Sequence, residues 1–252
     1  MRTNLRIVLM LAGAGVLGHA QWLNYPTPGI PRTPDGKPNL AAPAPRTADG
    51  KPDLSGIWQA DNTADNPAVR DLGVASFTPE GKVMPQRTPD TPCLPPSIAS
   101  IQLSPFKVYQ SAGALVVLYE DNLFRQIFLD GRPLPKDPNP TWLGYSVGRW
   151  EGDTLVADTN GFNSLREIIG GRSGGARLGP RPHSEALHVV EHLRRRDFGH
   201  MEIQFTIDDP KAYTKPWSFR EDVHLLPDTE LLEYICAENE KDFKHRVGSN
   251  DR

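Results

Sequence analysis

The residues best suited to proton transfer lie in the second half of the chain. Four histidines fall between residues 183 and 200: His183, His188, His192 and His200. Imidazole titrates near neutral pH, and a neighbouring carboxylate fixes its tautomer, so a His–carboxylate pair is the minimum set for general acid–base catalysis. If the protein is an enzyme, we expect His183 to act with Glu191 or Asp158 as a lyase, isomerase or hydrolase.

His188-Val-Val-Glu-His192 matches the H-x-x-E-H pattern of inverted zinc peptidases. That chemistry needs a helix, where residues four apart lie one above the other and share a metal. Here Leu187, Val189 and Leu193 recur at every second position, which is typical of a strand, and on a strand the two histidines would be about 13 Å apart. We therefore expect no metal and assign His188 to ligand binding. A metal held by histidines from adjacent strands is the alternative.

A basic run, Arg194 to Arg196, follows this segment. Strand alternation sends Glu191, Leu193 and Arg195 to one face. If that face is interior, Glu191 and Arg195 form a buried ion pair, which is costly unless it serves a ligand or a network. An interior guanidinium suits a carboxylate or another oxyanion, so Arg195 is predicted to bind a ligand. The alternative is a solvated charge run at the end of a hairpin.

Two further groups of polar and aromatic residues are candidates for ligand binding. Asp158 and Asn160 end one predicted strand, and His183 begins another after a long loop, so these residues would meet at a barrel mouth; simple turn chemistry is the alternative. An aromatic hairpin contributes Trp142, Tyr145 and Arg149. Packing within the sheet is the alternative for its aromatic residues.

The elements that must position these residues are strands. After a first strand near Leu54, segments rich in β-branched and aromatic residues alternate with short turns. The expected strands are 106–110, 114–120, 123–129, 145–150, 154–159, 188–196, 200–207, 217–226 and 230–236. Their tight connections predict an all-β, antiparallel up-and-down meander, which hides its edges best by closing into a lipocalin-like barrel of about 8–10 strands. A β-sandwich is the competing architecture.

Proline and glycine, 25 and 22 of 252 residues, concentrate outside the strands. Residues 31–40 are repeated imperfectly at 45–54, within a stretch that lacks large apolar residues. We expect residues 21–52 to be an extended Pro-rich arm, more a tether than a packed clamp. The barrel domain would span 53–245, with a flexible C-terminus at 246–252. Loops at 79–105 and 161–183 are expected to be lids.

The N-terminus and the cysteines indicate the compartment. Residues 1–20 have a basic start, a short apolar run and a small-residue cleavage site, as in an export signal, so we expect a periplasmic or secreted protein. In such a compartment Cys93 and Cys236 would form a disulfide or remain as buried thiols. The net charge of −3 excludes a nucleic-acid binder driven by bulk positive charge, and no window after residue 20 is long and apolar enough to span a membrane as a helix.

Three motifs resemble those of a family of exported bacterial lipocalin-like β-barrel proteins of unassigned activity. They are Gly144-Tyr-Ser-Val-Gly-Arg-Trp-Glu-Gly-Asp-Thr-Leu155, Pro182-His-Ser-Glu185, and Ile207-Asp-Asp-Pro210 followed by Lys215-Pro-Trp217. The resemblance covers residues 53 to 243 and implies an exported β-barrel. It transfers no catalytic role to any residue.

These observations together predict that the barrel holds a small organic molecule, aromatic or carboxylated, in its cavity, without a cofactor. The alternatives are an enzyme in the same cavity, or an envelope interaction module that has no cavity. Acid–base catalysis requires His183, Asp158 and Glu191 to lie within reach of one substrate.

Overall fold

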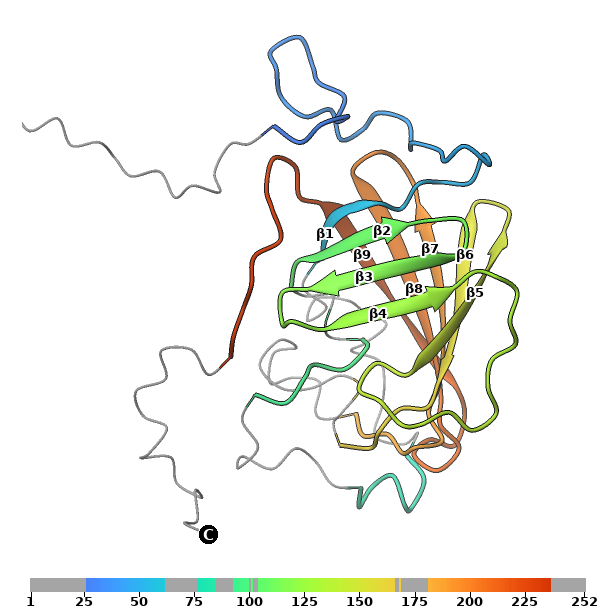
Figure 1. The fold of residues 1–252 in the computed structure, drawn as a ribbon. Coiled ribbons are helices and arrows are strands. Elements are labelled where there is room, and N and C mark those ends of the chain that lie inside the picture. The colour runs from blue at the N-terminus through green and yellow to red at the C-terminus, as the bar shows by residue number, and fades with distance from the viewer. Residues whose placement is uncertain are drawn as a thin grey trace, which may run out of the picture.

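The computed structural model describes residues 26–61, 77–84, 93–99, 101, 104–165, 168 and 181–236. Within these ranges nine strands form one closed barrel, which confirms the predicted lipocalin-like fold (Figure 1). The strands are β1 (Gly56–Ala60), β2 (Phe106–Gln110), β3 (Ala114–Tyr119), β4 (Phe124–Phe128), β5 (Tyr145–Glu151), β6 (Thr154–Asn160), β7 (His188–Arg195), β8 (His200–Asp208) and β9 (Trp217–Leu225). The predicted signal segment and C-terminal tail lie outside the described residues.

Side-chain alternation explains why these segments are strands. In β8 the buried residues Met201, Ile203, Phe205 and Ile207 alternate with more exposed polar ones. Such a strand has one face in the barrel and one in water. Phe205 stacks on Phe219 of β9, with ring centroids 4.7 Å apart and planes at 7°, so the interior is a packed apolar core.

The strand order follows the chain, and each neighbouring pair except one is antiparallel. The exception is β4–β5, which is parallel, so the expectation of a wholly antiparallel meander is wrong at this point. The reason is parity: strand directions cannot alternate all the way round a closed ring with an odd number of members. The Pro-rich connection at 129–144 returns the chain to the rim from which β4 began.

The predicted strand at 230–236 is not formed. After β9 the chain continues as an extended segment, residues 226–236, which we call the strap; it lies along the outside of the barrel (Figure 1). Its main-chain hydrogen bonds to the barrel include Leu226 N to Ile57 O and Tyr234 N to Glu120 O, both 2.8 Å. Cys236, at its end, forms a disulfide with Cys93, and their Cα atoms are 5.5 Å apart.

The N-terminal arm is packed, not a free linker. In each copy of the repeat, one main-chain N–H reaches across a small loop to a carbonyl: Asn39 N to Pro31 O at 2.7 Å, and Asp53 N to Pro45 O at 2.9 Å. The end of the first copy and the residues just after it bond to the β7–β8 turn, where Gly199 N donates to Leu40 O and Phe198 N donates to Ala42 O, both at 2.7 Å.

One arginine from each copy fixes the arm to the barrel. Arg32 binds Asp228 of the strap, and Arg46 binds Asp153 of the β5–β6 turn. We expected a tether because the sequence does not show these long-range ion pairs. They form only when the folded chain brings both carboxylates to the arm.

Candidate functional site

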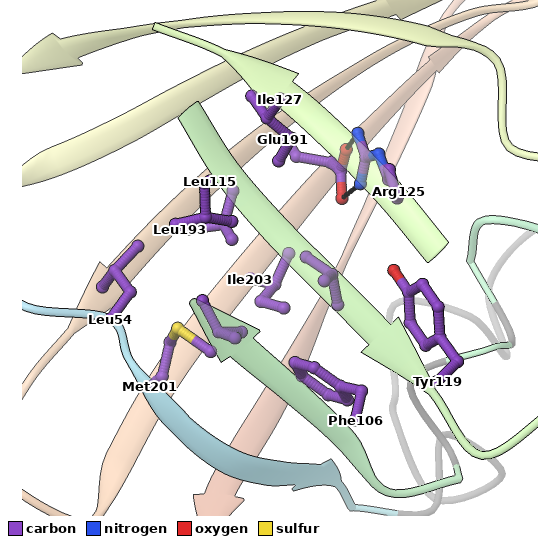
Figure 2. A pocket seen from close by; sticks show the side chains of 12 residues that line it. Leu54, Phe106, Leu115, Tyr119, Arg125, Ile127, Glu191, Leu193, Met201 and Ile203 are labelled. Atoms are coloured by element: carbon purple, nitrogen blue, oxygen red, sulfur yellow. Dashed lines mark hydrogen bonds and ion pairs between the residues drawn. The ribbon is translucent and has the colours of Figure 1, made fainter. Parts of the chain in front are cut away.

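Side chains almost fill the interior of the barrel. The interior cavity has a volume of about 20 Å³, lined mainly by apolar side chains and by Tyr119, Arg125 and Glu191 (Figure 2). A volume of this size accommodates about one water molecule. The part of the interior lined by these described residues is therefore too small for the small organic molecule predicted to bind in the barrel.

Arg125 of β4 and Glu191 of β7 form a buried ion pair across this interior (Figure 2). The guanidinium donates to Glu191 Oε1 at 3.0 Å, to Ser146 Oγ at 3.0 Å and to Thr159 Oγ1 at 2.9 Å, and its Nη2 also donates to Glu191 Oε2. Burial alone would lower the pKa of Arg125, but the adjacent Glu191 carboxylate more than offsets this and raises it. The polar atoms of the two side chains are thus satisfied by each other and by hydroxyl groups.

Glu221 of β9 is a second interior carboxyl group with a different environment. It is buried, and neither of its carboxyl oxygens has a hydrogen-bond partner among the described residues. Burial, with a further contribution from the negative charge of Glu191, raises the pKa of Glu221 well above its ordinary value. Glu221 therefore keeps its proton to a higher pH than an exposed glutamate does.

The three residues assigned to acid–base catalysis lie in three environments. Glu191 lines the interior cavity. Asp158 is on the outer face of β6, where it pairs with His188 of β7; their side chains are 28% and 38% exposed. His183 lines a separate cavity of about 10 Å³ with Phe162, and its Nδ1 lies 3.0 Å from Ser184 O. The structure does not bring these groups together around one substrate.

The histidines show no metal-binding arrangement. The H-x-x-E-H segment is a strand, as predicted, with His188 and His192 on the outer face and Glu191 inside. His200 pairs with Asp197 at 2.7 Å. Among the residues that the structure describes, no three His, Cys, Asp or Glu side chains are grouped to hold a metal ion.

The aromatic hairpin packs against its own surroundings. Trp142 lines the small cavity beside His183. Tyr145 packs on Phe128 with ring centroids 5.3 Å apart, and Arg149 pairs on the surface with Glu151 at 2.9 Å. Asn160 Nδ2 donates to Pro135 O at 2.6 Å and so holds the 129–144 connection. The structure assigns these residues packing contacts, as the alternative interpretation had it.

A much larger pocket lies between the arm and one end of the barrel. Its volume is about 330 Å³, within the range of pockets that hold drug-sized ligands. The arm contributes residues 27–30 and Pro45, the barrel contributes β1, Lys107 and Arg195, and the strap contributes Leu226, Thr229 and Glu230. We call this space the arm–barrel pocket.

Arg195 is the buried polar residue of this pocket. It is 5% exposed, and its guanidinium lies over the rings of Trp58 and Phe198, 4.8 and 5.0 Å from their centroids. Burial lowers the pKa of Arg195 to about 10, against weaker opposing effects of Asp53 and Asp197. The expected ion pair between Arg195 and Glu191 is not formed, because Arg125 occupies Glu191.

Sequence reasoning assigned Arg195 to ligand binding but missed Arg125, Glu221 as a site residue, and the arm as a pocket wall. Arg125 shares the inward face of β4 with Ile127, but Phe124 and Phe128 on the other face are more apolar. The apolar pattern of β4 therefore predicts that Phe124 and Phe128 face the interior, whereas Arg125 and Ile127 do. Glu221 was visible as a break in an otherwise apolar face of β9.

Comparisons of this chain with protein-family models, with curated proteins and with solved structures give no match. Among the described residues, no helix is long and apolar enough to cross a membrane. The functional argument therefore rests on the geometry above.

Proposed function

We propose that this protein is an exported small-molecule-binding protein, and that its ligand, an aromatic or carboxylated organic molecule, occupies the arm–barrel pocket. The carrying observation is the contrast in volume: about 330 Å³ between arm and barrel, against about 20 Å³ inside the barrel. Pockets of several hundred Å³ with apolar walls and a few convergent polar groups are the usual form of small-molecule sites.

The walls of the pocket match this role. Ile30 of the arm, Ile57 of β1 and Leu225 of β9 supply apolar surface from three separate parts of the chain. Polar groups are few and are carried by Asp53, Lys107, Arg195 and Glu230, with hydroxyl groups from neighbouring residues. Apolar surface of this kind contributes affinity, and the polar groups fix orientation.

Export is part of the same proposal. The Cys93–Cys236 disulfide supports it, since such bonds persist in oxidising compartments. The alternative of acid–base catalysis receives no such support, because Asp158, His183 and Glu191 are separated as described above.

The test uses N-phenyl-1-naphthylamine, a neutral aromatic probe whose fluorescence rises in apolar pockets. Titration of the wild-type protein should give a saturable signal. Thr229→Trp places an indole in the pocket wall and should weaken binding at least tenfold. The matched control is Thr206→Trp on the outer face of β8, where Thr206 contacts only the surface residue Ser218 in the hydrogen bonds described. Equal binding by both variants, or no binding by the wild type, would refute the proposal.

A further inference from the structure

We propose that the arm–barrel pocket selects organic anions, and that the anionic group of the ligand binds at the guanidinium of Arg195. This inference rests on the proposed function, since it names the class of ligand for the same pocket. The contacts of Arg195 favour an anionic ligand over a neutral aromatic one.

The hydrogen bonds of the Arg195 guanidinium all go to neutral main-chain carbonyls. Nε donates to Asp197 O at 3.1 Å, Nη1 donates to Ser55 O at 3.4 Å and to Asp53 O, and Nη2 donates to Phe198 O. A guanidinium has five N–H groups, so four are used and one, on Nη2, has no acceptor among the described residues. The contacts orient the cation firmly and leave one donor for a ligand.

No carboxylate neutralises this charge at close range in the described part of the chain. Asp53 and Asp197 act on the pKa of Arg195 through their charge, but neither forms an ion pair with it: Asp53 Oδ1 accepts from Ser55 N at 2.8 Å, and Asp197 Oδ1 accepts from His200 N at 2.8 Å. Buried charges in proteins are normally paired, because burial removes the hydration that stabilises them. A buried cation without an ion pair at the wall of a pocket therefore favours an anion in that pocket.

Arg125 provides an internal comparison. It is buried in the same barrel, and its guanidinium is bonded through two nitrogens to the Glu191 carboxylate. Arg125 borders only the small interior cavity, whereas Arg195 borders the arm–barrel pocket. Arg125, beside a cavity too small for a ligand, is thus paired with a carboxylate. Arg195, beside the large pocket, has no such partner among the described residues.

The remaining charges of the pocket do not reverse this preference. Lys107 and Glu230 lie 3.5 Å apart with side chains 27% and 47% exposed, so they offset each other and are screened by water. Asp53 also borders the pocket, but its carboxylate is bonded to Ser55 N and forms no ion pair with Arg195 among the described residues. The cation with the least access to water is Arg195, and a charge is felt most strongly where water is excluded.

The experiment measures two ligands of matched shape on the wild-type protein by isothermal titration calorimetry. They are 4-phenylbutyrate and its uncharged amide, 4-phenylbutyramide. The carboxylate should bind at least about tenfold more tightly, the ratio expected for one charge-assisted hydrogen bond, and this advantage should shrink as sodium chloride is raised. Equal dissociation constants, or tighter binding of the amine 4-phenylbutylamine, would overturn the inference while leaving the proposed function intact.

Variants test which cation of the pocket is the anchor, the group that binds the anionic group of the ligand. Lys211→Met removes a surface cation that does not line the pocket and should leave the carboxylate-to-amide ratio unchanged, while Lys107→Met tests the other cation of the pocket wall. Arg195→Met should abolish the ratio, provided that the variant unfolds cooperatively, and the comparison of ligands on the wild type decides the matter if it does not. Loss of the ratio in Lys107→Met would place the anchor at Lys107 and contradict the assignment to Arg195. If neither ligand nor the neutral naphthylamine probe binds, the proposed function itself fails.

Discussion

Arg32 and Asp228, 196 residues apart in the sequence, join the arm to the strap next to segments of both that line the arm–barrel pocket. Arg32 Nη1 donates to Asp228 Oδ2 at 3.1 Å, and Asp228 also accepts from Thr27 N at 2.8 Å. The arm and the strap have no strand pairing with each other in the described sheet, so these polar contacts join the two segments beside the pocket.

We expect Arg32→Ala to speed ligand exchange with little effect on folding. The ion pair is partly exposed, and exposed pairs contribute about 0.2–1 kcal/mol to stability. Its removal should raise the dissociation rate of N-phenyl-1-naphthylamine several-fold in stopped-flow experiments. Arg46→Ala removes the pair with Asp153 of the β5–β6 turn, which does not join the arm to the strap, and is the matched control. Identical rates for the two variants would contradict this role of Arg32.

Glu221→Gln should change how stability depends on pH. The folded protein holds the Glu221 proton more tightly than the unfolded chain, because burial raises the pKa of this carboxyl. The wild type therefore loses stability as pH rises above the unfolded pKa of about 4.5, and the loss continues up to the folded pKa, with a slope of at most about 1.4 kcal/mol per pH unit. Glutamine does not titrate, so the variant lacks this slope.

Urea unfolding of both proteins between pH 4.5 and 8 checks the Glu221 prediction. The surface aspartates Asp35, Asp49, Asp130, Asp153 and Asp228 have lowered pKa values, and the stability they provide is lost only as pH falls below their ordinary pKa of 3.8. They therefore do not obscure the window above pH 4.5. Parallel pH profiles for wild type and variant would show that burial does not raise the pKa of Glu221.

Glu191→Ala should destabilise the barrel strongly, by about 3–5 kcal/mol, because it leaves the Arg125 charge buried without its partner. Replacing both residues, with Arg125→Met and Glu191→Leu, should cost much less, since an apolar pair of similar volume needs no desolvated charge. Chemical denaturation of the two proteins measures the difference. The prediction fails if the double variant is no more stable than Glu191→Ala.

The disulfide should contribute substantially to stability. It closes a loop of 143 residues, and the chain-entropy model gives about 4–5 kcal/mol for a loop of this length. Cys93→Ser with Cys236→Ser should lower the free energy of unfolding by an amount of that order. Wild-type protein denatured with and without a thiol reductant gives an independent measurement, and equal midpoints would contradict the expectation.

The sequence predicts the strands well because each needs only local information. In β8 and β9 the alternation of apolar and polar residues survives over nine residues each, and one face is buried throughout. The prediction of a strand at 230–236 was wrong: its apolar residues Leu232, Tyr234 and Ile235 are exposed on the strap. Composition alone does not distinguish such a segment from a strand.

The candidate site was less predictable because it depends on closure of the barrel. Alternation placed Glu191 and Arg195 on the same face, which is correct, but the partner of Glu191 comes from β4, three strands away around the barrel. Similarly, the arm is held beside the barrel by Asp153 of the β5–β6 turn and Asp228 of the strap, which the two arginines of the arm reach. Neither relationship follows from spacing along the chain.

The parallel pair β4–β5 also determines where the barrel would open. Only two residue pairs join these strands, Ile127 with Ser146 and Phe128 with Val147, whereas eight pairs join β7 to β8. This short seam is therefore the place where the ring of hydrogen bonds can part with least loss. A sheet that opens there would unroll with β4 and β5 as its free edges, and the amides of these two strands would exchange with solvent before those of β7 to β9.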